Sequence, residues 1–332
     1  MEGAGDSAAA YRDALALFAA ADELGFDVGW VAEHHFKDVA GRLPSLFPFL
    51  AAAAQCTQRI RLGTAVAILP FENPLRVAED AAFVDALSGG RLELGVGSGL
   101  DPAEFKAFGV EIEERLLRTT EGLQVVQAAL RGEPLGTSDL RLNPAAPTLA
   151  ARIWQSGQSV VGAQHVARAG SGLLLARSII GPSSDAPTDE QQVPTVQAYL
   201  DEWKKMWGHT QMQPRIGMSR GIYPARDKAT ALDCVRAGVL RMAASQPTRF
   251  PQGESLEDYC RRLHLFYGPP AEIAAGLAQD RVMPFATDLI LQFSPVIPTL
   301  DEAIHILEQV ATQIAPALGW QPAQRAVGAH LA

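Results

Sequence analysis

The sequence predicts an α/β protein built on a parallel barrel of the (β/α)8 type. Short apolar runs alternate with amphipathic stretches of helical length, about seven such pairs can be counted, and the chain has 332 residues. This alternation is typical of a parallel sheet, and seven pairs come close to the eight of a barrel of about 250 residues. We therefore expect a single barrel domain over residues 1–332, with insertions near 178–213 and 245–263.

The first half of the chain shows the alternation most clearly. Tyr11, Leu15 and Phe18 are spaced by four and three, which predicts an amphipathic helix that Gly25 ends. Pro74 suits the first turn of a later helix. The expected helices of this half are 11–24, 45–56, 74–87 and 113–130, and the expected strands are 28–33, 59–69 and 91–96.

The second half repeats the pattern more loosely. We expect strands at 152–155, 172–176, 215–223 and 288–293 and a helix around 160–169. The last helix begins at Thr299, because its hydroxyl and the Glu302 carboxylate can form a capping box. Residues 1–10 contain no β-branched or aromatic residue, so we expect no strand before Tyr11. The first strand of an eight-stranded barrel is then missing, which leaves seven strands and a defect between 28–33 and 288–293.

Composition excludes several classes of function. The net charge is −9 and there is no basic run, which argues against nucleic-acid binding. The longest apolar stretch, near 46–54, is much shorter than the ~20 residues that cross a bilayer, and no signal peptide is recognisable. Three cysteines without CxxC spacing favour a reducing cytoplasm over a disulfide or zinc scaffold.

The strongest chemical signal is the stretch 26–36. An apolar run ends there in Glu33, His34 and His35. Strand ends of this kind face the active site of a β/α barrel, and histidine changes its charge near neutral pH. A core or surface histidine is the alternative, and these residues alone leave both interpretations open. Neighbouring strand residues point to opposite faces, so we expect no metal site at the two histidines.

Two later strand ends carry candidate ligand-binding groups. The stretch GVGSGL at 95–100 is either a tight bend or a place where backbone approaches a flat ligand. The stretch QSGQS at 155–159 precedes a helix, where Ser156 and Ser159 can bind an anion or simply cap the helix. Arg115 and Arg118 are the nearest cations that could reach this anion site, although either can be an ordinary surface arginine.

From about Tyr11 onward the chain resembles the bacterial luciferase-like flavin monooxygenases, within which it looks closest to a branch described as FMN-dependent. The matching motifs occur in the family's order: EHHF at 33–36, RLGTA at 61–65, LP at 69–70, NPLRVAED at 73–80, SGGRLELGVG at 88–97 and FKAFG at 105–109. The resemblance implies a TIM-type barrel that uses reduced FMN and O2.

The resemblance also assigns roles to residues. It implies that His34 is the active-site base beside the flavin, that His35 lies in the same site, and that 64–66 approaches the flavin ring, sometimes through a non-proline cis peptide. The residues expected to bind the cofactor are Thr64, Ala65, Ser98, Arg115, Gln155, Ser156 and Ser159. Gly97 and Ser98 stand where light-emitting members carry a reactive cysteine and a phosphate-binding arginine. Light emission is therefore not implied, and weaker phosphate binding is expected.

These features predict a cytoplasmic FMN-dependent monooxygenase that oxidises a small organic substrate. Reduced FMN is expected from a separate flavin reductase that binds transiently. The alanines at 51–54 suggest a homodimer through the second helix, because small side chains let helices approach closely. Three alternatives remain: a deazaflavin-dependent oxidoreductase, a metal-dependent barrel hydrolase, and a non-catalytic flavin-binding subunit.

Overall fold

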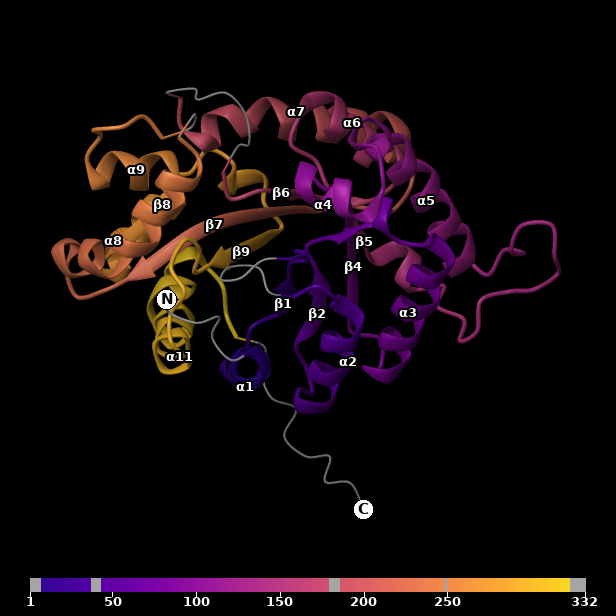
Figure 1. The fold of residues 1–332 in the computed structure, drawn as a ribbon, viewed down its shortest axis with the longest axis horizontal. Helices are drawn as coiled ribbons and strands as arrows, with labels where there is room; N and C mark the ends of the chain where they lie inside the picture. The colour runs from indigo at the N-terminus through magenta and orange to yellow at the C-terminus, as the bar shows by residue number, and fades with distance from the viewer. Residues whose placement is uncertain (1–6, 37–42, 179–185, 248–249, 323–332) are drawn as a thin grey trace, which may run out of the picture.

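The computed structural model describes residues 7–36, 43–178, 186–247 and 250–322, and nine strands of this part of the chain form one parallel sheet. The strand order is β1-β2-β4-β5-β6-β7-β8, with β3 beside β4 and β9 beside β7 (Figure 1). The strands are β1 Val28–Val31, β2 Arg61–Thr64, β3 Ala67–Ile68, β4 Leu92–Gly97, β5 Ile153–Ser156, β6 Gly172–Leu175, β7 Ile216–Pro224, β8 Leu265–Gly268 and β9 Asp288–Gln292.

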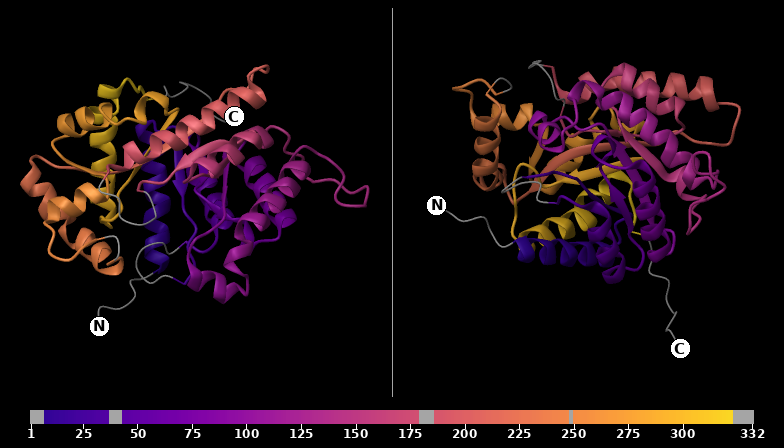
Figure 2. Two further views of the ribbon diagram at one scale, coloured as in Figure 1. Left: turned by 90° about the horizontal axis from the view of Figure 1, so that it is seen from above. Right: turned by 45° about the vertical axis from the view of Figure 1, so that its right-hand side comes forward.

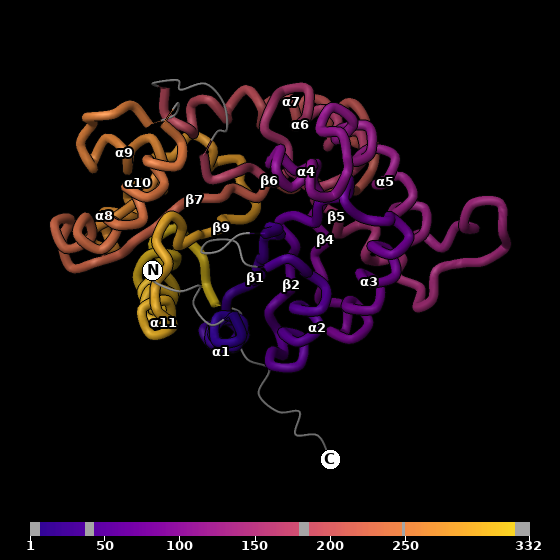
Figure 3. The backbone as a smooth tube through the Cα atoms, in the orientation of Figure 1, coloured from indigo at the N-terminus to yellow at the C-terminus, as the bar shows by residue number. Residues whose placement is uncertain are grey.

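Helices surround the sheet on the outside (Figures 1 and 2). Asn73, Asp101 and Ser159 cap three of them with side-chain oxygens, as expected for residues that precede a helix. The segment that follows α5 projects from the body of the molecule (Figure 3). The helices are α1 Ser7–Leu24, α2 Leu46–Cys56, α3 Pro74–Leu87, α4 Pro102–Phe108, α5 Arg115–Leu130, α6 Val160–Arg168, α7 Thr188–Trp207, α8 Lys228–Ser245, α9 Leu256–Arg262, α10 Pro270–Ala278 and α11 Leu300–Gln309.

The sheet curves into a barrel wall that has one seam. β7 pairs with β6 and β9 over its first part and with β8 over its last part. Among the described residues no ladder joins β1 to β9. Every residue of β1 and β9 is half-buried, whereas every residue of β4 and β7 is buried. The gap between β1 and β9 agrees with the expected defect, but the expected count of seven strands is wrong, because β8 was not predicted and the strand at 59–69 is divided in two.

Two helices lie along this seam. α1 packs against α11, and Figure 2 shows the indigo and yellow helices side by side. A cavity of about 420 Å³ lies between them, lined by Ala20, Glu23, Leu24, Ile304 and Glu308. α1 begins at Ser7, so residues 7–10 are helical, as their low β-propensity suggests. Residues 1–6, to which the same expectation applies, lie outside the described part of the chain.

Tryptophan and charged side chains fill the interior of the barrel at its amino-terminal end. The rings of Trp30 on β1 and Trp154 on β5 meet edge to face with centroids 5.6 Å apart. β1 and β5 are not neighbours in the sheet, so this contact crosses the interior. Trp154 Nε1 donates to Glu93 at 2.7 Å, and Glu93 also forms ion pairs with Arg61 and Arg215. These partners satisfy a carboxylate that would be costly to bury alone.

Several predicted elements need correction. The single strand predicted at 59–69 is two short strands, β2 and β3, separated by the cis peptide bond between Ala65 and Val66. Most of the insertion expected at 178–213 is the helix α7, which packs on α6 through its buried face. Pro194 and a polar outer surface hid this helix in the sequence. The capping box of Thr299 and Glu302 is confirmed.

Candidate active site

The two histidines of the first strand end lie on different faces. Ala32 and His34 are exposed, whereas Glu33 and His35 are buried. Both histidines follow β1 at the carboxyl end of the barrel, and the exposed His34 is the one that a ligand there could reach. His35 lies behind it, with its ring against Phe71 and Phe108. Of the two neighbouring histidines, His34 alone presents an accessible imidazole.

Carboxyl groups surround the buried His35. Its backbone N–H donates to Glu104 Oε1 at 3.1 Å, and its Nε2 lies 3.8 Å from Glu33 Oε1. Burial raises the pKa of Glu33 to about 7; the Ile68 N–H opposes this shift, whereas the charges of Glu72 and Glu104 add to it. Burial also lowers the pKa of His35. A buried carboxyl group that titrates near neutral pH is typical of functional sites.

Glycines bring the ends of β2, β4 and β5 close together. Thr64 Oγ1 donates to the Gly95 carbonyl at 2.7 Å and accepts from the Gly95 N–H at 2.8 Å. A Cβ atom at Gly95 would lie 2.0 Å from the Thr64 oxygen, and one at Gly97 would lie 2.4 Å from Val66 Cγ2 and 2.8 Å from Ser156 Oγ. Any side chain at Gly97 would collide with Val66 and Ser156, so only glycine allows these strand ends to come this close. The buried Thr64 hydroxyl is used within the wall.

The predicted anion-binding residues gather at the same strand ends. Arg115, the first residue of α5, donates to Ser98 Oγ at 3.1 Å, just beyond Gly97. Ser156 ends β5 and is exposed. Ser159 accepts from the Gly162 N–H at 3.1 Å and so caps α6, which was one of its two possible roles. The cap leaves the N-terminus of α6 beside Ser156, where helix N–H groups favour an anion.

Gln155 and Arg118 do not lie where a direct side-chain contact with the cofactor would need them. Gln155 is in register with Val96 and Leu173, whose side chains belong to the cores outside the barrel, so its side chain faces away from the interior. Only its backbone could contact a ligand there. Arg118 pairs with Glu114 through an exposed ion pair on its own helix. Arg115 is therefore the better placed of the two cations considered for the anion site.

These features match a known family over most of the chain. A model of the family of luciferase-like monooxygenases matches residues 2–283. The chain belongs to this family. Its relatives include the 4-hydroxyprotoasukamycin monooxygenase of Streptomyces nodosus subsp. asukaensis, 41% identical over 112 residues, and the limonene 1,2-monooxygenase of Rhodococcus erythropolis, 37% identical over 128 residues. The matched stretches cover 34% and 39% of this chain and only 30% and 33% of these relatives.

Three solved structures resemble nearly the whole chain. The monooxygenase RslO1 from Streptomyces bottropensis aligns with a TM-score of 0.75 and 27% identity, over 96% of this chain and 95% of that one. The oxygenating constituent of 3,6-diketocamphane monooxygenase from Pseudomonas putida, solved in complex with FMN, aligns with a TM-score of 0.74 and 16% identity, over 95% of this chain and 96% of that one. An F420-dependent secondary alcohol dehydrogenase aligns with a TM-score of 0.72 and 18% identity, over 93% of this chain and 95% of that one. The last two likenesses concern the fold alone, and they include both a flavin and a deazaflavin enzyme.

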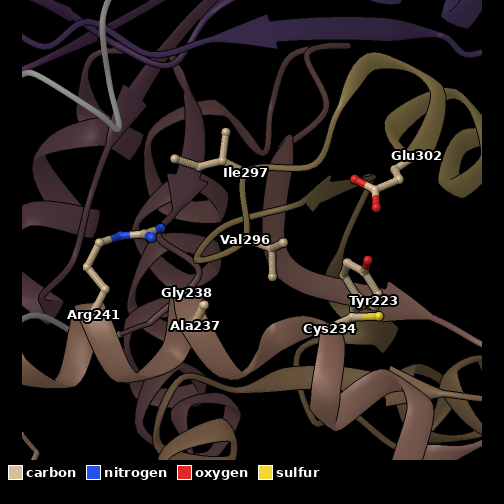
Figure 4. A pocket seen from close by; sticks show the side chains of 8 residues that line it. All are labelled: Tyr223, Cys234, Ala237, Gly238, Arg241, Val296, Ile297 and Glu302. Carbon is tan, nitrogen blue, oxygen red and sulfur yellow. The ribbon is translucent and has the colours of Figure 1, made fainter. Parts of the chain in front are cut away.

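A separate pocket lies outside the barrel of this luciferase-like chain. Its volume is about 240 Å³, and it lies between α8 and the segment joining β9 to α11 (Figure 4). Arg241 in this pocket donates to the Pro295 carbonyl, and Glu302 serves the cap at Thr299. Its lining residues are Tyr223, Cys234, Ala237, Gly238, Arg241, Val296, Ile297 and Glu302. None of the predicted site residues is among them, so we do not assign the chemistry to this pocket.

Sequence reasoning missed a buried charge cluster on the luciferase-like fold. Arg220 and Asp280 are fully buried and joined by two hydrogen bonds, and His264 Nε2 lies 2.9 Å from the same Asp280 carboxylate. An arginine within an apolar strand is a signal that could have predicted a buried acidic partner. In the described part of the chain, no group of three or more His, Cys, Asp or Glu residues could hold a metal ion. No described helix is long and apolar enough to cross a membrane.

Proposed function

We propose that the protein is a flavin-dependent monooxygenase that uses reduced FMN and O2 to oxidise a small organic substrate. The observation that carries this proposal is the gathering of Ser98, Arg115 and Ser156 at the ends of β4 and β5. It lies at the carboxyl ends of the strands, where β/α barrels bind their ligands. The exposed His34 follows β1 at the same end of the barrel.

The described residues fit FMN in two respects. Val66 and Ser156 come together over Gly97, so the segment 64–66 that the resemblance assigns to the flavin ring lies beside the groups proposed for its phosphate. Ser156, the N-terminus of α6, and Arg115 with Ser98 offer the donors that a phosphate group requires. When bound, reduced flavin would supply the electrons that activate O2, because this chemistry belongs to the cofactor.

The protein's own residues would then bind and orient the substrate and exclude water from the site. His34 would take up or release a proton at its imidazole nitrogen, as histidine does most often in general acid–base catalysis. Phe36, Leu100 and Phe108 are large exposed apolar residues near the same strand ends. Such residues favour an apolar organic substrate. The names of the relatives, which mention limonene and 4-hydroxyprotoasukamycin, agree with that class.

Cofactor choice gives the sharpest test. The purified protein would be mixed with reduced FMN or with reduced F420, and O2 consumption and ligand affinity would be measured for each. We expect tight binding and O2 consumption with FMN. Binding of F420 with hydride transfer and little O2 consumption would identify the deazaflavin alternative. FMN binding without O2 consumption would identify a non-catalytic subunit.

We also propose a homodimer, a transient flavin reductase as the source of reduced FMN, and a cytoplasmic location. Of the four alanines of α2 proposed for a dimer interface, Ala53 and Ala54 are buried within the chain and Ala52 is exposed. The exposed apolar residues Leu75, Phe83 and Leu87 instead lie along α3, which is the better candidate surface. Light scattering with Phe83→Glu would test this surface. The described cysteines are all free, which suits a reducing compartment.

A further inference from the structure

The carboxyl group of Glu33 connects two segments of the candidate site. Glu33 Oε2 accepts the Ile68 N–H at 2.7 Å, and Oε1 lies 3.8 Å from His35 Nε2. Ile68 lies in β3, directly after the segment 64–66, whereas Glu33 directly precedes His34. One buried side chain thus joins the end of β1 to the wall beside the proposed flavin site.

His35 is held by one backbone hydrogen bond and by aromatic rings. Glu104 accepts its backbone N–H, and Phe71 and Phe108 pack on its ring. His35 Nε2 is buried and has no hydrogen-bond partner among the described residues. A buried polar atom without a partner is costly, so a small rotation that brings Glu33 into hydrogen-bonding range is favourable.

We propose that Glu33 is a positioning residue that bridges Ile68 and His35 and so fixes His34 relative to segment 64–66. This inference rests on the proposed function, because the position of His34 matters there for proton transfer beside a bound flavin. Glu33 is buried and acts through its neighbours Ile68 and His35. Small displacements of a catalytic group can cost about 10²-fold in rate, so such a bridge has a large expected effect.

The protonated form of Glu33 is the one that can make both contacts. Its Oε2 can accept from Ile68 while a proton on Oε1 is donated to His35 Nε2. The titratable groups around it are Glu72, Glu104, His34 and His35, and burial with the two carboxylates raises the pKa of Glu33 to about 7. The bridge therefore forms as pH falls through about 7 and opens as pH rises through it. We expect turnover to decline on the alkaline side of this point.

The first experiment needs neither cofactor nor activity. The amide of Ile68 would be followed by NMR in protein labelled with ¹⁵N-isoleucine and assigned with Ile68→Val. We expect its shift to titrate with a midpoint of about 7. In Glu33→Gln the titration should vanish, whereas in the control Glu72→Gln it should remain with a lower midpoint, because the charge of Glu72 helps to raise the pKa of Glu33. An Ile68 amide that does not titrate, or that titrates equally in Glu33→Gln, would overturn the proposal.

The second experiment uses turnover with chemically reduced FMN. Glutamine can accept from Ile68 and donate to His35, so Glu33→Gln should keep near-normal turnover and lose the alkaline decline. Glu33→Ala should lose about 10²-fold in turnover with FMN affinity little changed. Equal turnover in Glu33→Ala and the unaltered protein would refute the positioning role. If the unaltered protein neither binds FMN nor consumes O2 while the Ile68 titration follows Glu33, the proposed function fails and the bridge stands.

Discussion

The barrel has a closed wall, β4 to β7, and a seam flanked by β1 and β9, and the two regions differ in burial. β4 and β7 are buried throughout, whereas each residue of β1 and β9 is half-buried. Two serines proposed to hold the phosphate belong to the closed wall. Ser98 follows β4, and Ser156 is the last residue of β5. His34 follows β1, at the edge of the seam.

This difference assigns different tasks to the two regions. Strands buried on both faces have high local stability, so the closed wall suits the binding of a cofactor in one fixed position. The seam side has fewer buried contacts and needs additional anchors for any group that must be placed accurately. The hydrogen bond from Ile68 to Glu33 is such an anchor. The following predictions alter one region at a time.

The largest effect is expected on the seam side, at His34. His34→Ala should keep the fold and most of the FMN affinity but lose turnover by about 10²–10⁴-fold, the usual contribution of a general acid or base. Oxygen consumption and FMN binding would be measured in parallel. His305→Gln is the matched control, because this exposed histidine of α11 pairs with Glu308 and belongs to neither the site nor the proposed bridge, so turnover should be unchanged. Near-normal turnover in His34→Ala would exclude its role as the base.

A pair of glycine substitutions compares the rigidity of the two regions. Gly95→Ala would bring Cβ within 2.0 Å of the Thr64 carbonyl oxygen, a backbone atom of the closed wall. Gly29→Ala on β1 would bring Cβ within 2.5 Å of the Phe18 ring, on a helix that flanks the seam. Denaturant unfolding should show a loss of about 3 kcal/mol for Gly95→Ala and about 1 kcal/mol for Gly29→Ala. Equal losses would mean that the two regions are equally rigid.

The closed wall should determine the affinity for FMN by binding the phosphate group of FMN. Replacing Ser156 and Ser159 together by Ala should weaken FMN by about 10–100-fold, because hydrogen bonds to a charged group are lost. The affinity for riboflavin, which lacks the phosphate, should fall by much less. Fluorescence titration with each flavin measures the difference. If both flavins weaken equally, the serines act only on the structure of α6.

The smallest effect is expected from filling the seam. An apolar strand of about ten residues added ahead of Met1 could pair with β1 and β9, and should raise Tm by about 2–4 °C. A Gly/Ser extension of equal length is the control, since it has low β-propensity. Calorimetry would compare the two. Equal melting temperatures would indicate that α1 and α11 already cover the unpaired edges of β1 and β9.

The closed wall could be predicted from sequence more fully than the site could. Apolar runs at 91–96 and 215–223 have nearly the bounds of β4 and β7, because strands buried on both faces leave a continuous signal. The grouping of Arg115 with Ser98 and the cis bond after Ala65 also agree with expectation, and these came from the family resemblance.

Long-range pairing of charges could not be predicted. Nothing near Glu33 in the sequence indicates that Ile68 and Glu104 would lie beside it, because these contacts depend on how separate strand ends meet. The same holds for Arg220 and Asp280, which are sixty residues apart. The helix α7 was missed for a different reason, since Pro194 and its polar face outweighed a buried face that includes Tyr199 and Trp203.

The edge-to-face pair of Trp30 and Trp154 has an optical consequence. The protein has five tryptophans, and these two lie inside the barrel below the proposed flavin space. Tryptophan emits light at wavelengths that the isoalloxazine ring absorbs, so a flavin bound above the pair would accept its excitation energy. The barrel thus contains its own donor for energy transfer. The loss of tryptophan emission would report the arrival of the cofactor without any added label.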